Sequence, residues 1–107
     1  MFYLVVHLYR HELQEDLMLA LEAQGISDVV IVDAVGKDKV LAFDMPIFAG
    51  FKADLEGRKL YAKLIMALVP DRETAEGFVS SLRESGINCS DPDVCKILLL
   101  PAEELGG

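Results

Sequence analysis

The spacing of hydrophobic and polar positions changes several times along the chain, and each change predicts a new element. Residues 2–9 (FYLVVHLY) form an aromatic and β-branched run, which is typical of a buried strand. Over residues 12–24 leucine recurs every four residues with acidic residues opposite, a pattern that predicts an amphipathic helix. Gly25 then stands where the C-terminus of a helix favours a left-handed residue. The chain is therefore expected to begin with a strand followed by a helix.

The rest of the chain continues with three strands and one more helix. Pro70 ends a long apolar run, and Asp71 after it is a favourable N-cap for the helix that follows. Gly86 again occupies the position just beyond a predicted helix end. The expected elements are a strand at 28–35, a strand at 58–69, a helix at 72–85 and a strand at 96–100.

This order of elements predicts an α+β fold, the ferredoxin-like βαββαβ arrangement, as a single domain over residues 1–107. Its antiparallel four-stranded sheet carries two helices on one face, so the other face is left bare. With 107 residues, 52% of them hydrophobic, the chain has more apolar surface than a small interior can hide. We therefore expect another subunit to cover the bare face.

A long loop interrupts this pattern between the second and third strands. Gly36 closes the second strand, and 21 residues (37–57) separate it from Arg58, where a short hairpin would suffice. Nine of the twelve residues at 40–51 are apolar, so the composition of the loop is not that of a disordered segment. Either the two strands extend into a longer hairpin that packs on a neighbouring subunit, or the loop is an exposed anchor for a partner protein. The anchor residues would be Phe43, Met45, Phe48 and Phe51.

Charge and composition narrow the possible partners. The net charge of −8 argues against a nucleic-acid-binding face, although six of the ten basic residues fall between positions 37 and 63. No apolar run reaches the roughly 18–20 residues of a membrane span, so the chain is expected not to cross a membrane. The N-terminal residues do not resemble a signal peptide, and the expected location is the cytoplasm, where cysteines stay reduced.

Few residues are candidates for chemistry. His7 and His11 are four positions apart across a strand-to-helix corner, which favours a structural role over a metal site. The spacing of Cys89 and Cys95 matches no short zinc or redox motif. Cys95 is interpreted as a small buried residue, with a regulatory disulfide across residues 88–95, or a metal, as alternatives. Because there is no nucleophile elbow, P-loop or zinc-protease motif, we expect no catalytic activity and assign no metal site.

Four segments together resemble the PII signal-transduction superfamily over nearly the whole chain. They are LVVHLYR at 4–10, the spacing from Gly25-Ile26 to Gly36, ALVPD at 67–71 and KILLLPAEE at 96–104. The resemblance implies a homotrimer with its sheets facing inward and three projecting loops, here 37–57, that engage a protein target such as a membrane transporter or an enzyme. In that family ATP, ADP or 2-oxoglutarate binds in clefts between subunits. The resemblance assigns five residues to this cleft: His7, Gly36, Lys37, Asp38 and Lys96.

The chain departs from the family pattern where phosphate would bind. The family has a Gly-Asp-Gly-Lys turn before its last strand, whereas this chain reads Asp93-Val94-Cys95-Lys96. The added side chains and the carboxylate would crowd and repel phosphate, because close backbone approach requires glycine. Asp38 replaces a second glycine, and the arginine pair that the family carries near its C-terminus is missing. The identity of the small ligand, and of any cofactor, is left open.

Two other functions remain as alternatives. A CutA-like trimer shares the fold and the assembly, and would bind metal through His7 or Cys95. A small ferredoxin-like isomerase or monooxygenase would need an apolar cavity between helices and sheet, but no residue pattern points to it. The leading hypothesis is a trimeric regulator that binds a small ligand between subunits and signals through loop 37–57.

Overall fold

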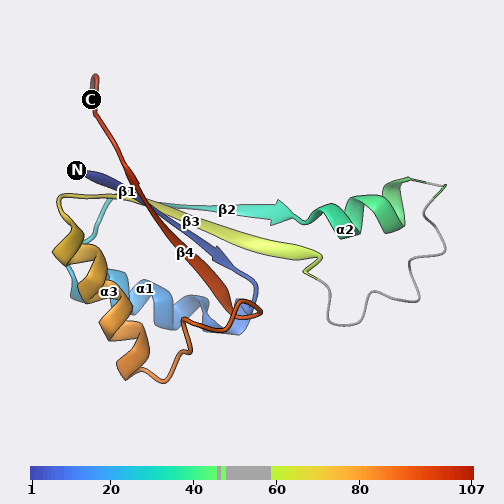
Figure 1. Ribbon diagram of the computed structural model, residues 1–107, viewed down its shortest axis with the longest axis horizontal. Coiled ribbons are helices and arrows are strands. Elements are labelled where there is room, and N and C mark those ends of the chain that lie inside the picture. The colour runs from blue at the N-terminus through green and yellow to red at the C-terminus, as the bar shows by residue number, and fades with distance from the viewer. Residues whose placement is uncertain (46, 48–58) are drawn as a thin grey trace.

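Four antiparallel strands form one sheet, and two helices cover one of its faces (Figure 1). The computed structural model describes residues 1–45, 47 and 59–107. The main elements are β1 (Phe2–Leu8), α1 (Gln14–Ala23), β2 (Val29–Val35), β3 (Tyr61–Val69), α3 (Arg72–Glu84) and β4 (Cys95–Pro101). The strand order is β2-β3-β1-β4, in which the strands of each βαβ half are separated by a strand of the other half. The expected ferredoxin-like α+β fold is confirmed.

The element boundaries differ slightly from those expected. A short 3-10 turn, His11–Leu13, precedes α1, so regular α-helix starts later than residue 12. The third strand begins at Tyr61 rather than at 58, and the last strand gains one residue at each end. These shifts occur at element ends, where backbone groups are partly unpaired and pattern alone fixes the boundary poorly.

Glycine ends both long helices, as predicted. Gly25 has a φ of 71° and Gly86 a φ of 85°, which place both in the left-handed region that favours glycine. After each glycine the chain turns back, because the backbone N–H of Ile26 donates to Leu21 and that of Ile87 donates to Leu82, both at 3.0 Å. Ile26 and Ile87 are themselves buried, so each cap also adds an apolar residue to the core.

Asp71 caps the N-terminus of α3 and carries a pH-dependent contribution to stability. The Thr74 backbone N–H and hydroxyl both donate to its carboxylate at 2.8 Å, and these bonds hold the pKa of Asp71 below its ordinary value of 3.8. Because the folded pKa is depressed, the contribution is complete above pH 3.8 and is lost as the pH falls through the folded pKa.

We therefore expect Asp71→Ala to lower the melting temperature at neutral pH, and the difference from wild type to shrink as the pH falls below 3.8. Thermal unfolding followed by circular dichroism across this pH range measures both values. The control is Asp71→Asn, which keeps a cap acceptor but does not titrate. A difference between Asp71→Ala and wild type that persists undiminished in acid would contradict this account.

The hydrophobic core lies between the helices and the inner face of the sheet. From β1 and β3 alternate residues point inward, as the two-residue period of a strand requires. The helices add the expected stripes, with Phe78 and Leu82 fully buried and Val79 half-buried. The largest fully buried side chains are Phe78, Leu4, Leu8, Leu17, Leu21, Ile65 and Leu82.

The segment after β2 is helical where the sequence predicted a loop. Residues Lys37–Lys39 form a single turn, α2, and Val40–Asp44 continue it as a π-helical turn. Figure 1 shows α2 projecting from the end of β2, away from α1 and α3. The interpretation that β2 extends into a longer hairpin is therefore wrong for residues 37–44. Lysine, leucine and alanine favour helix there over an extended strand.

None of the helices within the described residues has the length and apolar composition that crossing a bilayer requires.

Candidate functional site

A hollow of about 450 Å³ lies at the end of the sheet where β1 stops and β3 starts, and we call it the corner pocket. Leu8 is the last residue of β1 and pairs with Lys63, so the residues that follow it run past the beginning of β3. The loop before β4 completes the wall. The corner pocket is lined by Tyr9, Arg10, His11, Lys59, Leu60, Tyr61 and Asp93.

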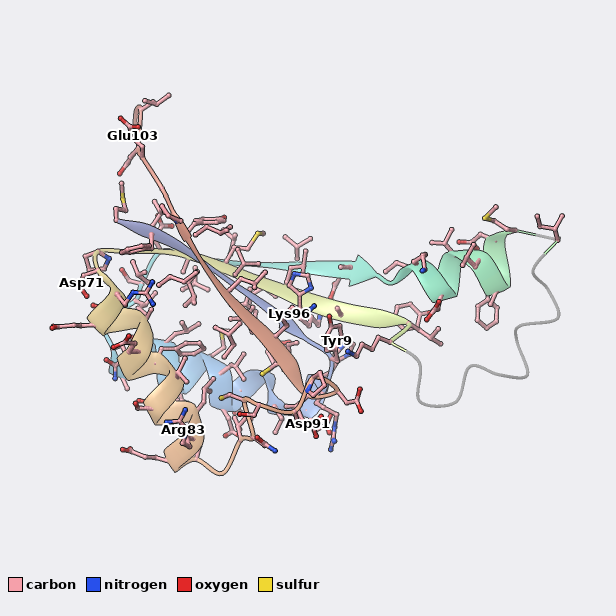
Figure 2. All side chains as sticks on the ribbon, in the orientation of Figure 1. Tyr9, Asp71, Arg83, Asp91, Lys96 and Glu103 are labelled. Atoms are coloured by element: carbon pink, nitrogen blue, oxygen red, sulfur yellow. The ribbon has the colours of Figure 1, made fainter. Side chains whose placement is uncertain are left out.

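Backbone hydrogen bonds fix the two loops that meet at the corner pocket. The Val94 carbonyl accepts from the N–H of Tyr9 at 3.0 Å and of Arg10 at 3.4 Å. Val94 is buried, so its side chain anchors the same loop in the core. Figure 2 shows Tyr9 at the end of the sheet from which α2 projects. The pocket wall is thus held by main-chain contacts between segments more than 80 residues apart in sequence.

Lys59 is the central cation of the corner pocket. Its ammonium lies 4.5 Å from the centre of the Tyr9 ring, within the range of a cation–π contact. The same Nζ is 3.9 Å from Oδ1 of Asp93, whose side chain is 81% exposed. An ion pair this long and this solvated contributes little to stability. Lys59 is therefore available to exchange Asp93 for another anion.

Arg10 brings a second positive charge to the same wall, and the His11 imidazole also lines it. Arg10 donates through Nε to the Glu12 carboxylate. The pKa of Glu12 is lowered first by a backbone hydrogen bond and then by Arg10, so this acid is ionised at neutral pH. Since Arg10 is exposed and has further N–H donors, one carboxylate does not occupy all of them. In a protein of net charge −8, an arginine and a lysine at one hollow, Arg10 and Lys59, favour a small anionic ligand.

The predicted cleft residues fall into two groups. His7 and Lys96 are directly opposite each other on β1 and β4, as their register pairing shows. Both point to the face of the sheet without helices, since the neighbouring Leu8 and Cys95 are buried in the core. Neither of them lines the corner pocket. The nitrogen Nδ1 of His7 is 3.5 Å from the Tyr9 hydroxyl, which links this group to the pocket wall.

The second group, Gly36, Lys37 and Asp38, stands at the base of the projecting segment. The Gly36 N–H donates to the Leu60 carbonyl at 2.7 Å. A Cβ built on Gly36 would lie 2.1 Å from the Lys59 carbonyl oxygen, so glycine is required by this close approach. Lys37 and Asp38 follow in α2. The structure thus joins Gly36 to the pocket wall through the backbone of residues 59–60.

Two of the four predicted anchor residues belong to the described part of the chain. Phe43 is 49% exposed and Met45 is 39% exposed, and both follow α2. Ala42, in the same π-helical turn as Phe43, is buried. The Lys39 ammonium lies 3.4 Å from the Asp44 carboxylate. Phe48 and Phe51 lie outside the described residues. The beginning of loop 37–57 therefore carries large exposed apolar side chains on a helical support.

The structure separates the residues that a metal site would need. His7 and Cys95 stand on adjacent strands but on opposite faces of the sheet, because Cys95 pairs with Leu8 and points into the core. Among the residues that the structure describes, no three His, Cys, Asp or Glu side chains are grouped so that they could hold a metal ion. The two cysteines are free thiols, and Cys95 is buried as interpreted from the sequence.

The sequence did not assign the pocket-lining residues to a ligand site. Tyr9, Arg10 and His11 follow the first strand directly, and Lys59 lies in the locally basic segment. Polar and aromatic residues just beyond a strand end were the available signal. Sequence spacing could not show that Asp93 faces Lys59, because that contact depends on how two loops pack.

Apart from His7 and Lys96, the bare face of the sheet is largely apolar across all four strands. Its central positions are Val5, Leu64 and Met66, and its edge strands add aliphatic side chains that are 42–50% exposed: Val30, Val32, Leu98 and Leu100. A continuous apolar surface of this kind marks an interaction site in a small protein.

Compared with known proteins, the chain matches no family model and no curated protein.

Proposed function

We propose that this protein is a PII-like regulator, which binds a small anionic ligand at the corner pocket and controls a partner protein through loop 37–57. The observation that carries the proposal is the hydrogen bond from Gly36 to Leu60. Leu60 and its neighbour Lys59 line the pocket, while Gly36 is the last residue before α2. A ligand that moves Lys59 therefore acts on the backbone at the base of the loop.

The charge of the pocket supports a small anion as the ligand. Among the described residues, Lys59 contacts Asp93 through a long, solvated ion pair and the Tyr9 ring through a cation–π contact, so an incoming carboxylate or bicarbonate can displace Asp93 at low cost. The chain lacks a glycine-rich turn at Asp93–Lys96, which disfavours a polyphosphate. Binding, with no covalent chemistry, is the role that this arrangement supports.

We further propose that three copies assemble through the bare sheet faces. Helices already cover the other face, and the exposed aliphatic side chains of β2 and β4 extend the surface to both sheet edges. Burying this surface between subunits removes it from water at a gain of roughly 25 cal/mol per Å². His7 and Lys96 would then face a neighbouring subunit, and that subunit would close the open side of the corner pocket.

The decisive experiment measures ligand binding and loop response in the same sample. Wild type and Lys59→Gln are heated with bicarbonate, 2-oxoglutarate, ADP or ATP, against chloride at equal ionic strength. We expect one small carboxylate or bicarbonate to raise the melting temperature of wild type, because a ligand of the folded state stabilises it by RT ln(1 + [L]/Kd). The same anion should change the rate of trypsin cleavage after Lys37 and Lys39, which belong to α2.

The control variant is Lys63→Gln, which removes a neighbouring β3 cation that pairs with Asp33 rather than lining the pocket. Lys59→Gln should lose both responses and Lys63→Gln should keep them. Stabilisation without any change at Lys37 and Lys39 would refute the coupling between pocket and loop. Stabilisation that Lys59→Gln retains would refute the assigned pocket.

A further inference from the structure

A second hollow, of about 350 Å³, lies between α3 and the inner face of β4, and we call it the helix groove. The strand order places β4 at an edge of the sheet. The volume of the helix groove falls within the roughly 300–1,000 Å³ that small-molecule sites occupy. It shares no lining residue with the corner pocket, so the two hollows are separate.

The floor of the helix groove is apolar because the helices leave part of the edge strand uncovered. On β1 the inward-facing Leu4 is 1% exposed, and Leu99 of β4 is directly opposite it. Leu99 and Ile97 pack against the same core but are only partly buried, as is Val79 of α3. These four side chains form the apolar floor. Its uncovered surface is what a ligand could remove from water.

The groove stays open because α3 presents small side chains to it. Ala75 and Val79 are one helical turn apart, so they lie on the same face of α3, and both line the groove. The larger Phe78 and Leu82 are fully buried in the core instead. A small residue at position 75 therefore leaves space between the helix and the edge strand.

Two arginines mark the ends of the helix groove. Arg72 and Arg83 are eleven residues apart, so they share one side of α3 and are separated by about 16 Å along its axis. Figure 2 labels Arg83 near the end of α3 that is farther from Asp71. Within the described part of the chain, neither arginine forms an ion pair with a carboxylate.

Glu76 and Phe2 distinguish the two ends. Arg72 lies over the Phe2 ring, 5.9 Å from its centre, and Glu76 follows Arg72 by one turn on the same rim. The Glu76 carboxylate opposes the positive potential there, but two turns separate it from Arg83. The loop after α3 adds the exposed Ser90, a hydroxyl donor, to the lining. The Arg83 end is therefore the one that favours an anion.

We propose that the helix groove binds a medium-chain aliphatic carboxylate, with its carboxylate at Arg83 and its chain along the apolar floor. A guanidinium donates two parallel N–H bonds to a carboxylate, and the chain covers the partly buried side chains. Glu76 repels a second carboxylate, so the groove favours a monoanion over a dicarboxylate. The proposal does not depend on the function proposed above. An assembly through the bare face would leave the groove open, because the groove lies on the helix-covered side.

Calorimetric titration of the full chain with hexanoate, octanoate and decanoate tests the ligand class. We expect the affinity to rise about two- to fourfold per added methylene, the upper value corresponding to full burial of each methylene. Two ligands of the same length as octanoate serve as controls. Octanol lacks the charge that Arg83 would bind, and octanedioate carries a second charge onto the apolar floor. Both should bind about tenfold more weakly than octanoate.

Two variants test the placement of octanoate. Arg83→Gln should weaken binding about tenfold, because an amide replaces the charge-assisted hydrogen bonds. Val79→Asp should abolish binding, since it places a carboxylate on the apolar floor. Its matched control is Ser80→Asp, at the adjacent exposed position, which should bind as wild type does. Circular dichroism checks folding. If Val79→Asp does not fold, Arg83→Gln, at an exposed position, still decides.

Three outcomes would overturn the helix groove as the site. They are a wild type that does not bind octanoate, binding that Arg83→Gln retains in full, and binding that Met66→Asp loses, which would move octanoate to the bare face. Lys59→Gln separates this proposal from the proposed function, since it should lose the small-anion response and keep octanoate binding. Loss of octanoate binding in Lys59→Gln would also overturn the groove. A wild type that binds octanoate but no small anion would refute only the proposed function.

Discussion

We expect Met66→Asp to prevent assembly of the proposed trimer and to leave the protein monomeric. Met66 lies in the middle of β3 on the bare face, opposite Val5 of β1 and Val30 of β2. In the proposed trimer a carboxylate at this position would be removed from water without a partner, which costs several kcal/mol per ion. Three symmetric copies would also bring three such charges toward one another. Few single substitutions could oppose assembly more strongly.

Sedimentation velocity at several protein concentrations measures the effect of Met66→Asp. The matched control is Ser80→Asp, which adds the same charge at an exposed position on α3, on the helix-covered side. Met66→Asp should be monomeric with an unchanged circular dichroism spectrum, and Ser80→Asp should assemble as wild type does. An assembly that survives Met66→Asp would exclude the bare face as the interface. A wild-type protein that is monomeric throughout would exclude the trimer itself.

Phe78→Ala is expected to cause the largest loss of stability. Phe78 is the largest side chain that is completely buried, and it points from α3 into the core between the helices and the sheet. Truncating a buried phenylalanine costs about 3–5 kcal/mol, because the transfer free energy is lost and the surrounding side chains only partly fill the cavity. The free energy of unfolding of a domain of this size is about 5–15 kcal/mol in total, so Phe78→Ala should remove much of it.

Urea unfolding at equilibrium gives the free energy of unfolding of Phe78→Ala. Phe78→Leu serves as the comparison, because it keeps most of the apolar volume and should lose considerably less. Val79→Ala, at the neighbouring half-buried position, should also have a smaller effect. A loss for Phe78→Ala no larger than that for Val79→Ala would mean that the helix packs less tightly on the sheet than the structure shows.

Local features of the sequence predicted most of the architecture. A helix cap at Asp71 and glycines at 25 and 86 are set by neighbouring residues, and all three occur where expected. The sequence did not predict the helical turn after Gly36, because its apolar residues do not alternate with polar ones at the spacing that identifies a helix. Of the predicted cleft residues, Gly36 contacts the pocket wall through a backbone hydrogen bond, and His7 contacts it through Tyr9.

The apolar loop between β2 and β3 shows where prediction from sequence stops. Its length, its position and its phenylalanines are properties of the chain alone. The sequence likewise determined the strand–helix order, because hydrophobic period and capping residues act over a few positions. Only the tertiary structure decided that Arg10, Lys59 and Asp93 surround one hollow and that Gly36 is bonded to its wall. Those contacts join residues distant in sequence, and they form only when the strands pair and the loops close over the sheet.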